Sequence, residues 1–308
     1  MARIGILLMA YGTPRSLAEV EAYYTHIRGG RRPSPEQVAA LQERYRRIGG
    51  RSPLLEITQA QARALAARLE AMAFGHTFRV RIGMRHSPPF IEEAVADLLA
   101  EGISQLVAIP LAPHYSQMSV GAYHAAVRRA LADRGADIAL LEIHRWGSHP
   151  LFLRAVAIRL REALEGLPPE ATHVLFTAHS LPARLRAEGD PYETELLDSA
   201  GRVARLLGLE RWTFAYQSAS ATGEPWLGPD LLEVLTDLAR EGQVRHVVVC
   251  PIGFIADHLE VLYDLDVEAR EHAERLGLTF RRSRSLNDDP LLIETLAALV
   301  CEAIGGSA

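Results

Sequence analysis

The chain contains no lysine, so all 33 of its basic residues are arginine. This excludes a phosphate-binding P-loop, because that motif uses a lysine to reach the phosphates. Any anion that a side chain binds is therefore bound by arginine or histidine. The 38 acidic residues give a net charge of −5, and without an excess of positive charge we expect no nucleic-acid partner.

Cysteine and long apolar runs are also scarce. Cys250 and Cys301 are the two cysteines among 308 residues, and their spacing fits neither a metal motif nor a disulfide framework. No uninterrupted apolar run approaches the roughly 20 residues of a membrane-spanning helix. The apolar run at 3–10 is not followed by a signal-peptide cleavage site. We therefore expect a cytoplasmic protein with no membrane span.

Two common motifs of α/β enzymes are missing as well. No G-x-G-x-x-G sequence follows an apolar run, and there is no G-x-S-x-G sequence. A dinucleotide oxidoreductase and an α/β-hydrolase are therefore not expected.

The sequence does contain a regular alternation of apolar strands and amphipathic helices. Several of the helical patterns end in glycine, the usual residue at a helix C-terminus. This alternation predicts βαβ units, and so parallel sheets covered by helices on both faces. The predicted strands are 3–10, 78–84, 105–111 and 137–143 in the first half, and 173–178, 212–217, 245–252 and 278–283 in the second.

The second half of the chain repeats the first. The segment DLLAEGISQLVAIPLA at 97–112 parallels DLAREGQVRHVVVCPIG at 237–253. Each contains a helix, a glycine turn, an apolar strand and a proline. We predict two similar doubly wound α/β domains with four-stranded parallel sheets, residues 1–147 and residues 148–308. The last helix, at 290–305, can return to either half.

The repeat includes two strand ends, AYGTP at 10–14 and AHSLP at 178–182. Both segments follow one pattern, which is alanine, a residue with a polar ring, a small residue, any residue and then proline. Ligands of open α/β sheets bind outside the carboxyl ends of the strands, so we expect the strand-end residues to line a cleft between the domains. Polar residues at these ends are Tyr11, His86 and His114 in the first half, and His179, Gln217, Ser218 and 257–260 in the second.

Three acids follow the seventh predicted strand at intervals of four residues, Glu260, Asp264 and Glu268. On a regular α-helix they form one row, with about 5–6 Å between successive Cβ atoms. Such a row is commonly a solvated face, but here it begins at a strand end, so we expect Glu260 to point into the cleft with His179. Imidazole and carboxylate together suit Fe(II), Zn(II) or Co(II) better than Mg(II) or Ca(II).

Arginines gather after the Tyr11 strand end. Some of them are expected on a solvated helix face. Since arginine binds carboxylates through two parallel hydrogen bonds, the others suit an anionic, polycarboxylate ligand. They are Arg28, Arg31 and Arg32 in a Gly-Pro-rich loop, and Arg44, Arg46 and Arg47 on the next helix.

Several segments together resemble the ferrochelatases, in particular the coproporphyrin III type of Gram-positive and related bacteria. The resemblance spans residues 3 to about 290, and HSLP and GFIADHLEVLYD are its most specific parts. It implies two chelatase-like, Rossmann-like domains, a monomer, and a lyase that inserts Fe(II) into a porphyrin to make haem. The segments are LLMAYGTP, YYTHIRGGRRPSPE, RYRRIGGRSPL, IGMRHSPPFIEEAV, LAPHYSQMSVGAY, TAHSLP, GDPYETEL, PWLGPD and GFIADHLEVLYDLDVEA.

The resemblance also implies residue roles. His179 and Glu260 would be the catalytic pair on the metal side, and Tyr11 would ligate the inserted iron. Tyr11 favours coproporphyrin, because protoporphyrin-type members usually carry an aliphatic residue at that position. Asp264 and Glu268 would match a second metal position. The contacts to the propionates would be Arg28, Arg44, Tyr45, Ser52 and Tyr123, with Thr13 nearby.

The sequence departs from the family at Gly29, where close relatives often have a second arginine, and at the C-terminus, which has no cysteine cluster for an iron–sulfur cluster. We therefore expect Fe(II) as a substrate and no permanently bound cofactor. The alternatives are a protoporphyrin IX ferrochelatase, a cobalt or nickel tetrapyrrole chelatase, and a non-enzymatic haem or metal carrier. The sequence leaves open the metal selectivity and whether His179 is mainly a base or a ligand.

Overall fold

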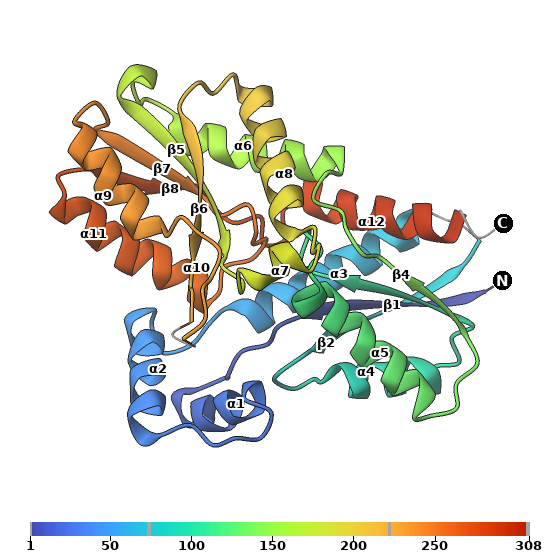
Figure 1. Ribbon diagram of the computed structural model, residues 1–308. Helices are drawn as coiled ribbons and strands as arrows, with labels where there is room; N and C mark the ends of the chain where they lie inside the picture. Colours follow the sequence, from blue (N-terminus) through green and yellow to red (C-terminus); the bar gives the residue numbers. More distant parts are fainter. Residues whose placement is uncertain (1, 73–74, 221–222, 306–308) are drawn as a thin grey trace. The chain divides into compact units, whose positions relative to one another are not determined.

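The computed structural model describes residues 2–72, 75–220 and 223–305. The chain divides into two compact units, one containing the chain up to Trp146 and again from Asn287, the other containing Gly147–Leu286. Each unit has one four-stranded parallel sheet with helices on both faces (Figure 1). The predicted fold class, two similar doubly wound α/β domains, is confirmed.

The first unit is built around β1, which pairs in parallel with β2 on one side and β3 on the other, in the order β2-β1-β3-β4. Helices α4 and α5 pack on one face through a buried hydrophobic cluster, and α3 packs on β1 and β2 and carries α12. The elements are β1 (Arg3–Ala10), a 3₁₀ turn (Leu17–Glu19), α1 (Val20–Ile27), α2 (Pro35–Arg47), α3 (Leu54–Ala71), β2 (Thr77–Met84), α4 (Ile91–Ala100), β3 (Gln105–Pro110), a π-helix (Gln117–Gly121), α5 (Ala122–Ala132), β4 (Ala139–Glu142) and α12 (Pro290–Gly305).

The second unit repeats this topology, with β5 in the place of β1 and the order β6-β5-β7-β8. Helices α6 and α8 pack together on this sheet, with α6 on β7 and α8 on β6. The elements are α6 (Pro150–Leu164), a 3₁₀ turn (Pro169–Ala171), β5 (Thr172–His179), α7 (Arg184–Ala187), α8 (Tyr192–Leu207), β6 (Trp212–Gln217), α9 (Leu231–Glu241), β7 (His246–Cys250), α10 (Leu259–Leu262), a π-helix (Asp264–Ala269), α11 (Arg270–Arg275) and β8 (Thr279–Arg282).

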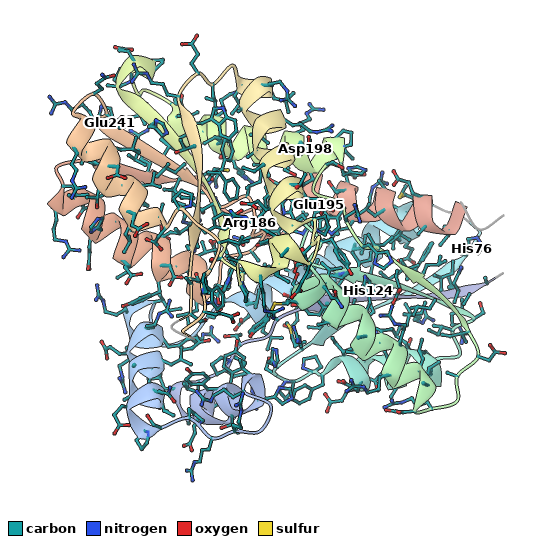
Figure 2. All side chains as sticks on the ribbon, in the orientation of Figure 1. His76, His124, Arg186, Glu195, Asp198 and Glu241 are labelled. Atoms are coloured by element: carbon teal, nitrogen blue, oxygen red, sulfur yellow. The ribbon has the colours of Figure 1, made fainter. Side chains whose placement is uncertain are left out.

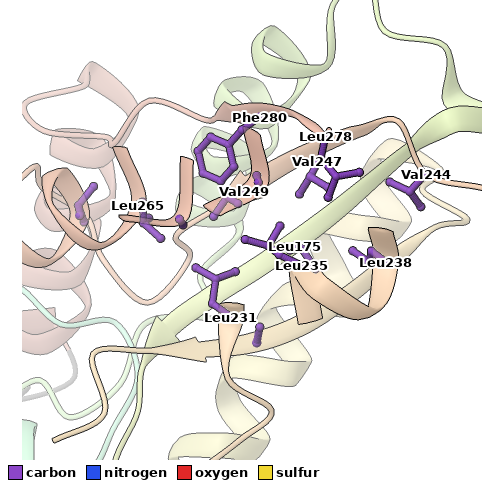
Figure 3. Packing of buried hydrophobic residues seen from close by; sticks show 14 residues of the cluster. Leu175, Leu231, Leu235, Leu238, Val244, Val247, Val249, Leu265, Leu278 and Phe280 are labelled. Atoms are coloured by element: carbon purple, nitrogen blue, oxygen red, sulfur yellow. The ribbon is translucent and has the colours of Figure 1, made fainter. Parts of the chain in front are cut away.

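A hydrophobic cluster holds the helices after β6 and β7 against the second sheet. Figure 3 shows Leu175 of β5 and Val249 of β7 facing Leu235 of α9 and Leu265 of the π-helix, all of them fully buried. Burying a side chain of this size contributes about 1.5–3 kcal/mol. The segment that follows β7 is therefore fixed to the sheet through its apolar side, and its polar side remains for other contacts.

The last helix, α12, belongs to the first unit, so the second domain ends at Leu286 instead of at residue 308. Its apolar face, which includes Leu296, is buried. Polar contacts fix it further, because Arg68 Nε of α3 lies 2.7 Å from Glu294 Oε1, and Gln61 Nε2 donates to the Asn287 carbonyl oxygen at 2.6 Å. These long-range contacts decide between the two placements that the sequence allowed.

Two smaller observations concern cysteine and the membrane. Cys250 is a buried free thiol, and burial raises its pKa to about 12, which makes it unreactive near neutral pH. Within the described ranges, no helix is both long enough and apolar enough to cross a membrane.

Candidate active site

His179 and Glu260 lie side by side in the second unit. His179 is the last residue of β5, and Glu260 is in α10, which follows the neighbouring strand β7. His179 Nε2 is 3.5 Å from Glu260 Oε1, and His258 Nε2 is 3.5 Å from the other carboxylate oxygen, Oε2. The side chains of His179 and Glu260 are 29% and 31% exposed, so both are accessible to a ligand.

The surroundings fix the protonation of this pair. Nδ1 of His179 donates to the Ser180 carbonyl oxygen, which leaves Nε2 facing Glu260. Burial disfavours the imidazolium, but the Glu260 carboxylate outweighs burial and raises the pKa of His179 to about 9. Burial also disfavours the Glu260 carboxylate, but His179 and then His258 hold its pKa well below its usual range. The metal-free pair is therefore imidazolium and carboxylate at pH 7.

Gly253 allows the segment that carries Glu260 to approach β5. Its backbone N–H donates to the Thr177 carbonyl oxygen at 3.1 Å. A Cβ at position 253 would lie 2.5 Å from Ala178 Cβ, closer than carbon atoms can pack. Only glycine permits this approach, and the sequence IGF after Cys250 therefore determines how near Glu260 comes to His179.

The end of β6 supports the same two residues. Gln217 is the register partner of His179, and its Nε2 donates to the Glu260 carbonyl oxygen at 2.8 Å. The next residue, Ser218, has a left-handed backbone with φ of 62°, and its hydroxyl donates to Asp264 Oδ2. Consecutive residues of one strand end thus bind positions 260 and 264 of the acidic segment.

The three acids do not form the single row that the sequence predicts. Helix α10 ends at Leu262, and a π-helix follows over Asp264–Ala269. The backbone hydrogen bonding therefore changes within the acidic segment, from i→i+4 in α10 to i→i+5 in the π-helix. Burial lowers the pKa of His179, and the charge of Asp264 adds to the larger effect of Glu260 in raising it. Asp264 is 5% exposed, whereas Glu268 is exposed. The structure therefore brings Asp264 to the pair and leaves Glu268 on the surface.

Tyr11 occupies, in the first unit, the position that His179 has in the second. It directly follows β1, and it is 40% exposed. Its ring packs on that of His86 with a centroid separation of 4.6 Å, and His86 Nδ1 lies 3.0 Å from His26 Nδ1. Burial, together with Arg85 and His26, lowers the pKa of His86 to about 3. The exposed phenol of Tyr11 therefore packs against a neutral imidazole, that of His86.

Gly12 makes the turn that presents Tyr11. Its φ of +99° is rarely adopted by other residues, and a Cβ there would lie 2.6 Å from Ser87 Oγ. Ser87 Oγ accepts from the Thr13 N–H at 3.0 Å, and the His86 N–H donates to the Tyr11 carbonyl oxygen at 2.9 Å. The turn after β1 is thus locked onto the residues that follow β2.

The predicted hydroxyl contacts of the first unit are deeply buried. Thr13 Oγ1 lies 3.3 Å from the Tyr45 hydroxyl, which joins the turn after β1 to α2. Ser52 Oγ accepts from the N–H of Leu54, the first residue of α3, at 3.3 Å. Tyr123 belongs to the hydrophobic cluster under α4 and α5. All four residues are at most 5% exposed, so each has a structural role besides any contact to a ligand.

Arg28 has the clearest capacity for an anion. Its Nη1 donates to Gln37 Oε1 at 3.3 Å, and its guanidinium lies 5.7 Å from the centroid of the Tyr24 ring. Its Nε is buried, with no hydrogen-bond partner among the described residues. A buried N–H without an acceptor is costly, and a carboxylate would satisfy it. Arg44, half-buried on α2, is placed one residue before Tyr45.

Two exposed arginines of the same region have acidic partners. Arg32 pairs with Glu21, and Arg46 pairs with Glu43, in both cases between largely exposed side chains. Such surface pairs contribute at most about 1 kcal/mol. They form the solvated face that the sequence suggested for part of this arginine-rich segment.

A resident metal site is not evident in the part of the chain that the structure describes, where no three histidine, cysteine, aspartate or glutamate side chains are grouped to hold a metal ion. In the first unit, His124 of α5 (Figure 2) and His144 lie 3.6 Å and 3.8 Å from the Glu142 carboxylate, but Arg128 already pairs with that group.

Sequence reasoning missed two contacts. His258 binds the second oxygen of Glu260, and its extended backbone places residues 258 and 260 on the same side. The spacing of two residues was a signal that could have shown this. The contact of His26 with His86 had no such signal, since the two residues are 60 positions apart.

The sequence relatives cover nearly the whole chain. The family model for ferrochelatase matches residues 3–304. A ferrochelatase of Herpetosiphon aurantiacus is 46% identical over 97% of this chain and 98% of its own. A coproporphyrin III ferrochelatase of Geobacillus thermodenitrificans is 41% identical over 98% of this chain and 96% of its own.

Solved structures resemble the fold at lower sequence identity. SirB from Bacillus subtilis with Fe³⁺ has a TM-score of 0.64 at 12% identity, covering 100% of this chain and 97% of that one. CbiX, the terminal enzyme for biosynthesis of siroheme in denitrifying bacteria, has a TM-score of 0.51 at 17% identity, covering 99% of both chains. At these identities the likeness supports the fold and not the substrate.

Proposed function

Because the chain belongs to the ferrochelatase family of metal-insertion enzymes, which act on porphyrin and iron, we propose that it inserts Fe(II) into coproporphyrin III to give coprohaem in haem biosynthesis. The observation that carries the choice of porphyrin is Tyr11, an exposed phenol at the end of β1. Further support comes from relatives named coproporphyrin III ferrochelatase that are 41% and 42% identical over 98% and 96% of the chain.

Insertion must remove two pyrrole protons and deliver iron to the four pyrrole nitrogens. We assign the acceptance of protons and the delivery of iron to His179 and Glu260. A cation that approaches Glu260 opposes the positive charge on the neighbouring imidazolium, so Nε2 of His179 releases its proton as the metal arrives. The neutral Nε2 then serves as ligand or base, while His258 holds the other oxygen of the carboxylate.

In this proposal, residues of the first unit bind the propionate groups of the substrate. Arg28 and Arg44 would bind propionate carboxylates, together with the hydroxyl groups of Thr13, Tyr45, Ser52 and Tyr123 where these can turn toward the ligand. Fixed contacts at the periphery of the ring orient it for the reaction. If they hold the macrocycle bent, its nitrogen lone pairs leave the ring plane, and the enzyme favours the transition state over the flat substrate. Tyr11 would ligate the iron of the product.

The decisive assay offers the protein Fe(II) anaerobically, with coproporphyrin III or with protoporphyrin IX. We expect catalytic loss of the free-base spectrum with both, and a kcat/KM for coproporphyrin III that is higher by at least about tenfold, because unsatisfied arginines reject the substrate that lacks two carboxylates. A preference for protoporphyrin IX contradicts the proposed subtype. Turnover that stops at one equivalent would instead identify a carrier, and replacement of Fe(II) by Co(II) or Ni(II) tests the other chelatases.

A further inference from the structure

Gln217 connects the two members of the His179–Glu260 pair. It is 3% exposed, and its backbone pairs in register with His179, its carbonyl oxygen accepting from the Ser180 N–H at 2.8 Å. Its side chain reaches the other member, since Nε2 donates to the Glu260 carbonyl oxygen at 2.8 Å. One residue is thus bonded to the strand that carries the imidazole and to the segment that carries the carboxylate.

The segment that carries Glu260 has little internal support. Helix α10 contains four residues, Leu259–Leu262. A helix this short is not stable by itself, because its first turn fixes several dihedral angles for few hydrogen bonds. The next element is a π-helix, whose hydrogen bonding differs from that of α10. The position of Glu260 therefore depends on contacts from outside α10.

Stability alone does not favour glutamine at position 217. Its Oε1 is buried, with no hydrogen-bond partner among the described residues. An unsatisfied buried acceptor destabilises the folded protein, and an apolar side chain of similar size would avoid that cost. What glutamine supplies and an apolar side chain cannot is the hydrogen bond to Glu260.

We propose that Gln217 is a positioning residue that sets the separation of His179 Nε2 from the Glu260 carboxylate. The inference rests on the proposed function, in which this pair accepts protons and passes the metal. Gln217 touches neither metal nor porphyrin in this proposal and acts only through Glu260. A misplacement of about 1 Å in a catalytic group can cost about 100-fold in rate, so a moderate shift of α10 should be visible in turnover.

The chain contains a matched control in the first unit. Gln61 is also fully buried, its Nε2 donates to a backbone carbonyl oxygen, that of Asn287, and its Oε1 likewise has no partner among the described residues. Gln61→Met and Gln217→Met therefore make the same chemical change, removing one buried hydrogen bond and one unsatisfied acceptor. The two substitutions differ in the backbone carbonyl oxygen that loses its hydrogen bond, which is that of Asn287 in Gln61→Met and that of Glu260 in Gln217→Met.

The test measures Gln217→Met and Gln61→Met beside the unaltered protein by iron insertion, urea unfolding and an NMR pH titration of His179 without metal. For Gln217→Met we expect kcat to fall about tenfold with an unchanged KM for porphyrin and an unfolding midpoint at least as high as before. His179 should titrate lower than in the unaltered protein, because Glu260 is less well held against it. Gln61→Met should keep kcat and the titration of His179.

Wild-type kcat in Gln217→Met overturns the inference, and so does an equal loss of kcat in Gln61→Met. A lowered kcat with an unmoved titration of His179 also contradicts it, because the pair would then be undisturbed. Failure of the proposed function is a separate result, since the unaltered protein would then insert no iron. The titration of His179 would in that case still decide whether Gln217 positions Glu260.

Discussion

At the scale of single residues, charge determines the resting state of the candidate site. A histidine at a strand end is expected near its ordinary pKa, but the Glu260 carboxylate holds His179 as an imidazolium up to a pKa of about 9, against the effect of burial. In the proposed mechanism, iron and this proton would compete for Nε2, so the pair would couple metal arrival to proton release. That coupling needs both residues.

We therefore expect His179→Ala and Glu260→Ala each to lower kcat for iron insertion by at least about 100-fold, the usual scale for loss of an acid–base group. Porphyrin affinity, measured by fluorescence titration, should stay largely intact. His173→Ala is the control, because His173 lies on the same strand and contacts Thr213 at 3.1 Å, outside the candidate pair. Near-normal turnover of His179→Ala would refute the assignment.

The phenol of Tyr11 allows a spectroscopic test. Tyr11→Phe keeps the ring that packs on His86 and removes the oxygen. We expect the visible spectrum of the bound iron porphyrin product to change, because the proposed oxygen ligand of the iron would be lost, while Tyr115→Phe leaves the spectrum unchanged. An identical spectrum in Tyr11→Phe rules out ligation by this residue.

At the scale of elements, the acidic segment after β7 is held at both ends by one arginine of β8. Arg282, 11% exposed, lies 3.2 Å from Asp257, just before α10, and 2.8 Å from Asp266, in the π-helix. Ser285 Oγ adds a hydrogen bond to Asp257 at 2.7 Å. These contacts hold the π-helical segment Asp264–Ala269 in place, and the regular spacing of the acids in the sequence could not reveal this segment.

Arg282→Met should lower the free energy of unfolding by about 2 kcal/mol. Removing one partner of a buried ion pair costs about 3–5 kcal/mol, and the partial exposure of Asp257 and Asp266, 22% and 27%, reduces this. Urea unfolding measures the change. Arg240→Met, which removes an exposed pair with Asp237, should change stability by less than about 1 kcal/mol. Equal effects of the two substitutions would show that Arg282 is not a structural clamp.

At the scale of the whole molecule, two units repeat one topology. A histidine in the first unit and a histidine in the second make the free energy of unfolding depend on pH in opposite directions. Burial lowers the pKa of His114 in the first unit to about 3. The contribution of His114 to the free energy of unfolding is therefore complete above its unfolded pKa of about 6.5 and is lost as the pH falls toward 3. The pKa of His179 is raised to about 9, so its contribution is complete below about 6.5 and is lost as the pH rises through 9.

The free energy of unfolding should therefore have a broad maximum near pH 6.5 as far as these two groups contribute. Each group changes stability by at most about 1.4 kcal/mol per pH unit within its window. His114→Asn should flatten the acid side, and Glu260→Gln should flatten the alkaline side, in urea unfolding across pH 4 to 10. An alkaline side that stays steep in Glu260→Gln would contradict the raised pKa of His179.

The sequence by itself determined the eight strands, the repeat and the proximity of His179 to Glu260. These follow from local patterns, since apolar runs bounded by glycine and proline specify strands, and parallel strands bring their carboxyl ends to one edge of a sheet. Only the tertiary structure decided that α12 returns to the first unit, that Asp264 is buried while Glu268 is exposed, and that Gln217 contacts Glu260. These features depend on packing and hydrogen bonds between residues distant in the chain or on a departure from regular helical geometry, and neither leaves a periodic signal in the sequence.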